Sequence, residues 1–408
     1  MTTMADNKDK KVLNVPHLRF PEFSGEWEEI TLGKISEITK GSGISKDQLS
    51  EQGSPCILYG ELYTKYKSEI IDVVYSRTEL ESSSLVKSKA NDVIIPCSGE
   101  TAIDISTARC VPFNNILLGG DLNIIRLKHD DGGFFAYQLN GARKKDIARV
   151  AQGVSVVHLY GVNLKHIRVY HPAIEEQKKI TRLLSLMDER IATQNKIIED
   201  LKKLKSAISK YLFARKDLLE TTICLSNIAT LKNGYAFQSG KYNALGKWKI
   251  LTITNVPGER YINDEDCNCI INLPNDIQDH QVLKEGDILI SLTGNVGRVS
   301  LCKNGNYLLN QRVGLLQLAK NVNQEFLYQI LSSQRFENSM IACGQGAAQM
   351  NIGKGDVENY VLPYSSNGNN ILWVAKILHS YDECIINELR RLTLFTMQKQ
   401  YLLTQMFI

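Results

Sequence analysis

The chain has 408 residues and a formal net charge of +4, with 43% hydrophobic and 23% charged residues. This length accommodates two or three domains, each able to bury a core, and the proportions are those of a globular protein without a membrane-length apolar run. The nine cysteines include no CxxC pair, and the seven histidines show no zinc-ligand spacing. We therefore expect reduced thiols in the cytoplasm, no metal site and no membrane partner.

The N-terminal part of the chain changes character at about residue 15. Residues 1–14 are polar and predict a disordered terminus. Residues 15–172 contain short apolar runs separated by Gly, Ser and Asn, which is the pattern of short strands joined by turns. We interpret this stretch as a first mixed α/β domain.

Residues 173–216 predict a long helix. The stretch 173–213 contains neither Gly nor Pro, and apolar residues fill eight of ten positions taken at alternating steps of four and three. This pattern is typical of a coiled-coil seam rather than of the broader stripe of a surface helix. Such a helix would be roughly 60 Å long. Gln194 and Lys205 are the two polar breaks in its seam.

Residues 217–367 repeat the pattern of the first domain. Landmarks recur in the same order at offsets of 191–195, so that 91–95 matches 286–290 and 135–139 matches 326–330. Each match is weak alone, but the shared order and spacing indicate an internal repeat. We interpret this stretch as a second mixed α/β domain.

Residues 368–408 repeat the helix. Adding 194 to each seam position gives a second seam that is again apolar at eight of ten positions, and its breaks, Glu388 and Lys399, fall at the same two layers. Two unrelated helices would not place their breaks in register. The predicted fold class is therefore α+β, with two similar mixed α/β domains separated by two long helices that form an antiparallel coiled coil.

The polar breaks also predict the register of this coiled coil. Antiparallel pairing in which residue numbers sum to 593 places Lys205 against Glu388 and Gln194 against Lys399, which gives every polar break a partner. A register one heptad away, at 586, overlaps more layers but sets Lys205 against Tyr381. We expect the first register, because an unpartnered polar group in a seam costs about 1–3 kcal/mol. If both lysines instead extend to water, this constraint disappears.

The sequence contains no catalytic signature. It has no two adjacent prolines, which an amino-methyltransferase box requires, and no G-x-x-x-x-G-K-[ST] phosphate loop. The loops instead carry side chains suited to DNA: Arg and Lys for guanine and phosphate, Asn and Gln for adenine, and Ser and Thr for either. The candidate DNA-binding residues are Lys40, Ser42, Lys46, Tyr63, Lys65, Tyr66, Lys67, Arg143, Lys144, Lys145, Arg149, Gln152, Thr293, Asn295, Arg298, Gln311, Arg312, Gln345, Gln349 and Asn351.

Three stretches resemble the specificity subunits of type I restriction–modification systems. They are the lead-in at 15–23, the glycine-hinged turn at 293–297, and Pro172 followed by Glu175-Glu176-Gln177. The resemblance covers essentially the whole chain. It implies two target-recognition domains, each reading one half of a bipartite double-stranded DNA target, and paired helices that set the spacing and bind two methyltransferase subunits. One departure is that the second helix begins Asn369-Asn370 where the first has Glu175-Glu176-Gln177.

On this resemblance the chain itself is not an enzyme. Catalysis would come from its partners, which are the methyltransferase subunits with S-adenosylmethionine and the restriction subunits, an ATP- and magnesium-dependent translocating nuclease. The alternative interpretation is a coiled-coil scaffold whose duplicated domains bind protein rather than DNA. Salt-dependent DNA binding distinguishes the two, because phosphate contacts release counterions.

Overall fold

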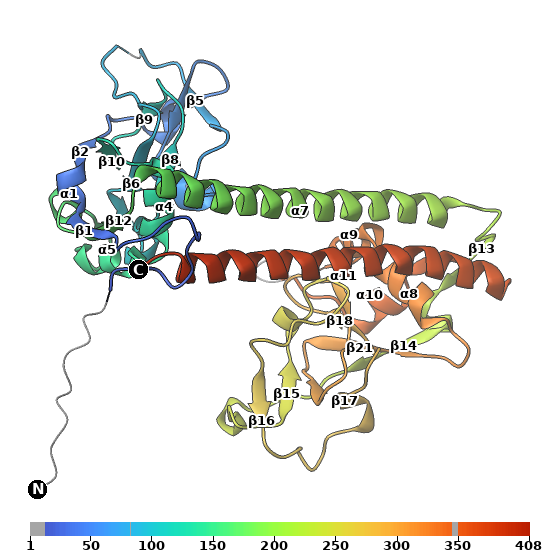
Figure 1. The fold of residues 1–408 in the computed structure, drawn as a ribbon. Helices are drawn as coiled ribbons and strands as arrows, with labels where there is room; N and C mark the ends of the chain where they lie inside the picture. The colour runs from blue at the N-terminus through green and yellow to red at the C-terminus, as the bar shows by residue number, and fades with distance from the viewer. Residues whose placement is uncertain (1–12, 82, 345–349) are drawn as a thin grey trace, which may run out of the picture. The chain divides into compact units, whose positions relative to one another are not determined.

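The computed structural model describes residues 13–81, 83–344 and 350–408 (Figure 1). The chain divides into two compact units. Unit 1 joins the chain up to Asn195 with Arg391–Ile408, and unit 2 is Lys196–Arg390. The long helices are α7 (Ile174–Ala214), green in Figure 1, and α11 (Gly368–Gln405), red. Each unit therefore contains one mixed domain together with one end of each long helix.

The domain of unit 1 is built on two four-stranded sheets. The central sheet has the order β2-β10-β6-β8, and the second sheet has the order β3-β5-β4-β9. Two-stranded ribbons pair β1 with β12 and β7 with β11. The strands are β1 (Glu28–Thr31), β2 (Ser36–Lys40), β3 (Leu49–Ser50), β4 (Ser54–Ile57), β5 (Ser76–Thr78), β6 (Asp92–Pro96), β7 (Ser98–Gly99), β8 (Arg109–Val111), β9 (Leu117–Leu118), β10 (Leu122–Leu127), β11 (Val157–His158) and β12 (Arg168–His171). The helices are α1 (Leu32–Ile35), the 3-10 turn η1 (Lys46–Gln48), α2 (Glu61–Thr64), α3 (Ala102–Ile105), α4 (Gly132–Asn140), α5 (Lys144–Val150) and α6 (Gly161–Leu164).

The domain of unit 2 repeats the central sheet, while its second sheet differs in one edge strand, because β17 pairs with β20 where β3 pairs with β5 in unit 1. Its central sheet has the order β14-β21-β18-β19, and its second sheet has the order β16-β15-β20-β17. A ribbon of β13 and β22 replaces that of β1 and β12. The strands are β13 (Thr221–Cys224), β14 (Ala229–Asn233), β15 (Trp248–Leu251), β16 (Asn268–Ile270), β17 (Val282–Leu283), β18 (Ile288–Ser291), β19 (Val299–Leu301), β20 (Tyr307–Leu309), β21 (Val313–Leu318) and β22 (Val361–Tyr364). The helices are the 3-10 turns η2 (Leu225–Asn227), η3 (Ser239–Lys241), η4 (Ile253–Asn255) and η5 (Asp279–Gln281), with α8 (Gln324–Leu331), α9 (Gln334–Cys343) and α10 (Lys354–Glu358).

The central strand of each domain is buried on both faces. In β6, Val93 and Ile95 pack into the cluster that includes α4, while Ile94 packs into the cluster beneath the second sheet. In β18, Ile288 and Leu289 divide between the corresponding clusters of unit 2 in the same way. This division follows from the alternation of side chains along a strand. The duplication inferred from sequence is therefore present in the order of the central sheet and in its packing.

The domains pack on the ends of the long helices. In unit 1, Leu184 of α7 and Phe407, just beyond α11, belong to the domain core. In unit 2, Leu212 of α7 and Leu378 of α11 belong to the domain core. Within the described ranges, no helix combines the length and apolar character that crossing a membrane requires.

The predicted register of the two helices is wrong. In unit 2 the Lys205 ammonium lies 2.6 Å from Asp382 rather than beside Glu388, and in unit 1 the Lys399 ammonium lies 2.5 Å from Asp188 rather than beside Gln194. In both units the numbers of the paired residues sum to 587, which is one more than the sum of 586 that defines the alternative register. Aspartates that adjoin the seam satisfy both lysines, so the energetic argument for a sum of 593 does not apply.

In the Glu175-Glu176-Gln177 sequence at the start of α7, the last two side chains make buried hydrogen bonds within unit 1. Both Glu176 oxygens accept hydrogen bonds of 2.7 Å from Arg19, and Gln177 bonds to Asp130 and to the backbone of Asp131. Glu176 and Gln177 are each only 1% exposed. These side chains fix the start of α7 and leave little surface for a partner.

Candidate nucleic-acid interface

One edge of the central sheet in unit 1 collects chain ends from three strands. Lys40, the last residue of β2, pairs with Asn123 of β10. Leu122, the first residue of β10, pairs with Pro96, the last residue of β6. The segment that follows β6 therefore leaves the sheet beside Lys40.

That segment forms a small platform with β11. Ser98 pairs with His158, and His158 exchanges two backbone hydrogen bonds, of 2.9 and 2.7 Å, with Gln152. The ring of Tyr160 stacks on His158 with a centroid distance of 6.2 Å. Asn123 of the central sheet donates to the Leu159 carbonyl at 2.9 Å, which holds the platform over the same edge. We call Lys40, Ser98, Gln152, His158 and Tyr160 the first edge group.

The corresponding edge of unit 2 carries a different set of side chains. Thr293 pairs with Asn351, and the Gly294 amide donates to the Met350 carbonyl at 2.8 Å. The Leu292 amide donates to the Arg312 carbonyl at 3.1 Å, and the Gln311 amide donates to the Tyr235 carbonyl at 3.0 Å. We call the set that these bonds bring together the second edge group: Tyr235, Asn295, Gln311, Arg312 and Asn351.

The turn at 293–297 shows why glycine is needed there. Gly294 and Gly297 have φ values of +74° and +80°, a region that residues with a side chain rarely adopt. Asn295, between them, is exposed, whereas Thr293 is only 7% exposed. Thr293 therefore supports the turn, and its buried position removes it from the candidates for base contact.

The loop candidates of unit 1 outside the edge group have mixed environments. Lys46, in η1, and Lys67 are exposed, while Tyr63 of α2 is half-buried. The Ser42 hydroxyl accepts a hydrogen bond from the Val86 amide at 2.8 Å. Lys65 is bonded to Glu61 at 2.6 Å.

Tyr66 is a correction to the sequence prediction. It is only 3% exposed and belongs to the core beneath the second sheet. Burial raises the pKa of its hydroxyl well above the usual range. A side chain in this position reaches no DNA without local unfolding, so Tyr66 is a core residue.

Basic residues on and next to α5 make contacts that stabilise the fold. Arg143 donates to the carbonyl of Ile408 at 2.6 Å, and Arg149 pairs with Asp146 at 2.8 Å. Burial lowers the pKa of Lys144, while Lys145 is exposed. Arg143 thus secures the C-terminal residue in unit 1.

The remaining candidates lie elsewhere. Arg298 faces Glu337 of α9 with 3.4 Å between Nε and the carboxylate, away from the turn that precedes it. Gln345 and Gln349 fall outside the described residues. No group of three metal-ligating side chains occurs in the parts of the chain that the structure describes.

Sequence reasoning missed Ser98, His158 and Tyr160 in unit 1 and Tyr235 in unit 2. A signal for two of them was present, since Ser98 lies 195 residues before Thr293 and His158 lies 193 residues before Asn351. Carrying the candidates of the second domain back onto the first would have identified both.

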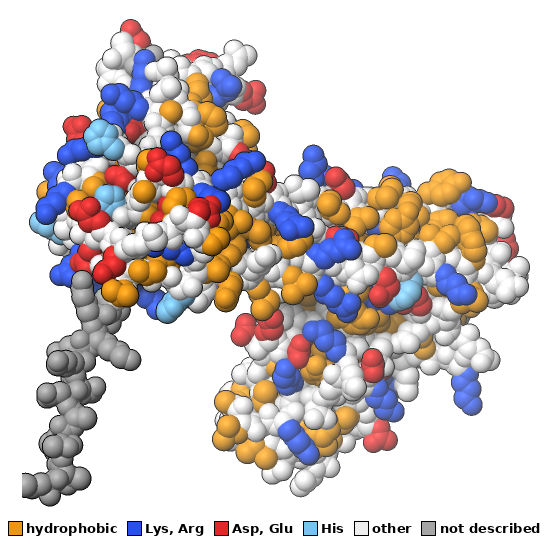
Figure 2. All heavy atoms as spheres, in the orientation of Figure 1, with side chains coloured by type: hydrophobic (Ala, Val, Ile, Leu, Met, Phe, Trp, Pro, Cys, Tyr) orange, Lys and Arg blue, Asp and Glu red, His pale blue; other side chains and the backbone are white. Residues whose placement is uncertain are grey.

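Surface charge is dispersed. On the face shown in Figure 2, Lys and Arg side chains lie among Asp and Glu side chains and form no continuous patch. This agrees with the small net charge of +4. On this face, recognition of nucleic acid would therefore depend on particular loops rather than on a broad basic surface.

Two proteins that resemble this chain in sequence are named as specificity subunits of type I restriction enzymes. The specificity subunit of the type I restriction enzyme MjaVIII of Methanocaldococcus jannaschii is 24% identical over 361 residues, which cover 82% of this chain and 80% of that protein. The putative type I restriction enzyme MjaX specificity subunit of the same organism is 25% identical over 247 residues, or 56% of each chain.

Solved structures share the fold. The S subunit of a type I restriction-modification system from M. genitalium superposes with a TM-score of 0.62 at 17% identity, covering 97% of this chain and 99% of that one. A chain from a structure on complex assembly and conformational transition of the type I R-M system gives a TM-score of 0.56 at 15% identity, covering 93% and 97%.

A family model for the type I restriction modification DNA specificity domain matches residues 24–203 and again residues 220–393. The two matches span most of the chain and divide it as the duplication does. The chain therefore belongs to the family of type I restriction–modification DNA specificity proteins.

Proposed function

We propose that this chain is the specificity subunit of a type I restriction–modification complex and reads a bipartite, asymmetric double-stranded DNA target. Residues 15–172 form one target-recognition domain and residues 217–367 the other, with spacer helices at 173–216 and 368–408. The observation that carries the proposal is the pair of edge groups. Equivalent edges of two equivalent central sheets present chemically different side chains, all exposed except the half-buried Ser98 and Tyr235, as an asymmetric target requires.

The proposed partners follow from the relatives, which are named as subunits of type I restriction enzymes. Two methyltransferase subunits would use S-adenosylmethionine, and restriction subunits would use ATP and magnesium. The chain would supply sequence selection and no catalytic group. All nine of its cysteines are free, which suits a place in the cytoplasm beside the DNA.

The edge groups are tested by single substitutions in the complex with methyltransferase. His158→Ala should weaken binding at one half-site by about 1–3 kcal/mol, and Gln311→Ala should do so at the other. Arg168→Ala, at an exposed position on β12, is the matched control and should change neither half-site. Competition binding with duplexes mutated in one half-site at a time measures each effect. Loss of discrimination at both half-sites from one substitution would contradict two separate readers.

Salt dependence separates this proposal from a protein-binding scaffold. Binding of the complex to duplex DNA should weaken steeply as salt rises, because each phosphate contact releases a counterion. A complex that assembles on the chain but shows no salt-dependent DNA binding would favour the scaffold.

The helices are tested as a ruler by lengthening both. Inserting seven residues in α7 between Asp188 and Lys205, and seven in α11 between Asp382 and Lys399, preserves both Lys–Asp layers. Each helix lengthens by about 10 Å, close to three base-pair rises of about 3.4 Å. We expect the same half-sites separated by a gap about three base pairs longer. An unchanged gap in an active variant would mean that the methyltransferases set the distance.

A further inference from the structure

Each unit buries one Lys–Asp pair between α7 and α11. In unit 1 the pair is Lys399 and Asp188, whose side chains are 14% and 10% exposed. In unit 2 the pair is Lys205 and Asp382, whose side chains are 17% and 8% exposed. An aromatic ring lies near each ammonium group, Tyr137 at 5.6 Å from Lys399 and Tyr328 at 6.0 Å from Lys205. The two ends of the helix pair thus present the same arrangement.

Each domain adds one further charged side chain to this pair, from an equivalent backbone position. The Glu69 carbonyl accepts from the Cys110 amide of β8 at 2.8 Å, and the Arg260 carbonyl accepts from the Leu301 amide of β19 at 2.7 Å. The residues that follow, Ile70 and Tyr261, form parallel bridges to the same two strand residues. Positions 69 and 260 are therefore the same place in the two copies of the fold.

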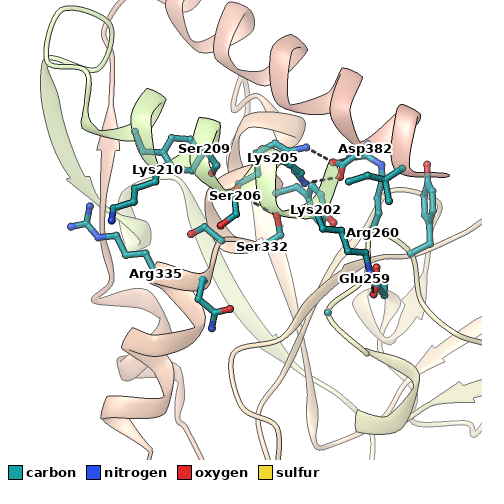
Figure 3. A pocket seen from close by; sticks show the side chains of 18 of the residues that line it. Lys202, Lys205, Ser206, Ser209, Lys210, Glu259, Arg260, Ser332, Arg335 and Asp382 are labelled. Atoms are coloured by element: carbon teal, nitrogen blue, oxygen red, sulfur yellow. Dashed lines mark hydrogen bonds and ion pairs between the residues drawn. The ribbon is translucent and has the colours of Figure 1, made fainter. Parts of the chain in front are cut away.

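The two positions carry opposite charges. Glu69 accepts from Lys399 at 2.6 Å. Arg260 donates to Asp382 at 2.9 Å and to Glu325 at 2.6 Å. Figure 3 shows Lys205 and Arg260 directed at Asp382 along the wall of a cavity of about 1440 Å³ in unit 2. One domain thus contacts the lysine of its Lys–Asp pair, and the other contacts the aspartate.

Each domain compensates for the charge that it brings. In unit 1 the guanidinium of Arg109 is buried, donates to the carbonyls of Leu62 and Tyr66, and interacts electrostatically with Glu69. In unit 2 the compensating charge is Glu325, which binds Arg260 bidentately. Both clusters thereby combine two acids with two bases. Buried charges are tolerated when they are paired and hydrogen-bonded in this way.

The charged position is connected to the proposed reading edge through one sheet. In unit 1 the segment that carries Glu69 pairs with β8 through Ile70. Strand β8 pairs with β6, and the chain continues from β6 to Ser98. In unit 2 the segment that carries Arg260 pairs with β19 through Tyr261. Strand β19 pairs with β18, and the chain continues from β18 to the turn that holds Asn295. A hydrogen-bonded sheet therefore joins each charged position to the corresponding edge group.

We propose that Glu69 and Arg260 are positioning residues for DNA specificity, each holding the reading edge of its own domain on the Lys–Asp pair of its own unit. This inference rests on the proposed function and adds residues that contact no DNA. It predicts that loss of either charge impairs one half-site and leaves the other unchanged. A merely structural role would lower the amount of active protein without changing selectivity.

The test uses the full chain in complex with methyltransferase and maps methylated sites. Glu69→Gln should lower selectivity at one half-site about tenfold, and Arg260→Gln should do the same at the other. Arg260→Lys keeps the positive charge and should retain most of the selectivity at that half-site. Glu29→Gln and Arg168→Gln remove an exposed ion pair in unit 1 and are matched controls that should change nothing.

The outcomes distinguish failure of the proposed function from failure of the positioning role. If the unaltered chain with methyltransferase modifies no bipartite site, the proposed function fails. If it does modify such a site but both substitutions leave selectivity unchanged, or lower it equally at both half-sites, the positioning role is overturned. If Glu69→Gln does not fold, Glu69→Asp replaces it, because this variant keeps the charge but shortens the side chain. It should lower selectivity at the same half-site by a smaller factor and leave the other half-site unchanged.

Discussion

The two polar clusters place different side chains at their centres. In unit 1 a single ammonium group, that of Lys399, lies between the carboxylates of Glu69 and Asp188. In unit 2 the central group is the Asp382 carboxylate, which accepts from Lys205, Arg260 and Gln329. Duplication preserved the backbone while the charges diverged. The same substitution should therefore have different consequences in the two copies.

The largest difference is expected for the two lysines. Lys399→Met removes the ammonium group that bonds both Glu69 and Asp188. Asp188 keeps the neutral donors Ser68 and Tyr137, so unit 1 should lose about 3–5 kcal/mol even with Arg109 nearby. Lys205→Met leaves Asp382 bonded to Arg260 and Gln329, so unit 2 should lose only about 1 kcal/mol. Native-state hydrogen exchange measures the units separately. Equal losses would mean that the two clusters do not differ as described.

The aromatic anchors at the helix ends form a second contrast. Phe407 is 4% exposed and packs against Phe134 and Trp27, with ring centroids 5.2 and 6.3 Å away. Phe213, its counterpart 194 residues earlier, is only partly buried. We expect Phe407→Ala to cost about 3–5 kcal/mol and Phe213→Ala about 1–2 kcal/mol.

Chemical denaturation monitored by hydrogen exchange in each unit measures these costs. Phe407→Leu is the matched control, because it keeps most of the buried volume and should recover much of the loss. A larger cost at Phe213 would reverse the comparison.

The smallest contrast concerns pH. A hydrogen bond to Asp130 raises the pKa of His171 above its usual 6.5. A raised pKa stabilises the fold fully below the unfolded value and loses that contribution as pH rises through the folded value. Unit 1 should therefore weaken slightly as pH rises above the usual 6.5 and through the raised pKa of His171. Tyr364, which carries no imidazole, occupies the corresponding place at the end of β22.

Hydrogen exchange near the start of α7, measured across this pH range, checks the prediction. His171→Gln should remove the pH dependence without changing that of unit 2. Persistence of the slope in this variant would assign it to other groups.

The duplication and the long helices could be predicted because they depend on periodicity. Helix α7 was expected at 173–216 and spans Ile174–Ala214, since an apolar seam without Gly or Pro leaves the backbone few alternatives. The order of the sheets follows no such local pattern, because strand neighbours such as β2 and β10 are far apart in the chain.

The register could not be predicted from the seam. A shift of one heptad leaves the apolar pattern almost unchanged, so the decision falls to the polar residues. The true partners of the lysines, Asp188 and Asp382, adjoin the seam rather than belonging to it. A third partner, Glu69 or Arg260, comes from a domain more than a hundred residues away in the chain.

The proposed reading surface was predicted only in part. Gln152, Asn295 and Gln311 have the exposed positions expected of them, but Tyr66 is in the core and Thr293 is buried beneath its turn. Residue type in a loop indicates chemistry but not direction, and direction is set by packing that the local sequence does not encode.

The most direct test of the central claim is to map methylated bases after replacing one recognition domain. Residues 221–367 would be exchanged for the equivalent domain of a relative, and the chain produced in cells with its methyltransferase subunits. If each domain reads its own half-site, one half of the methylated sequence changes and the other half remains. A change in both halves together, or the absence of any two-part methylated sequence with the unaltered chain, would contradict the account.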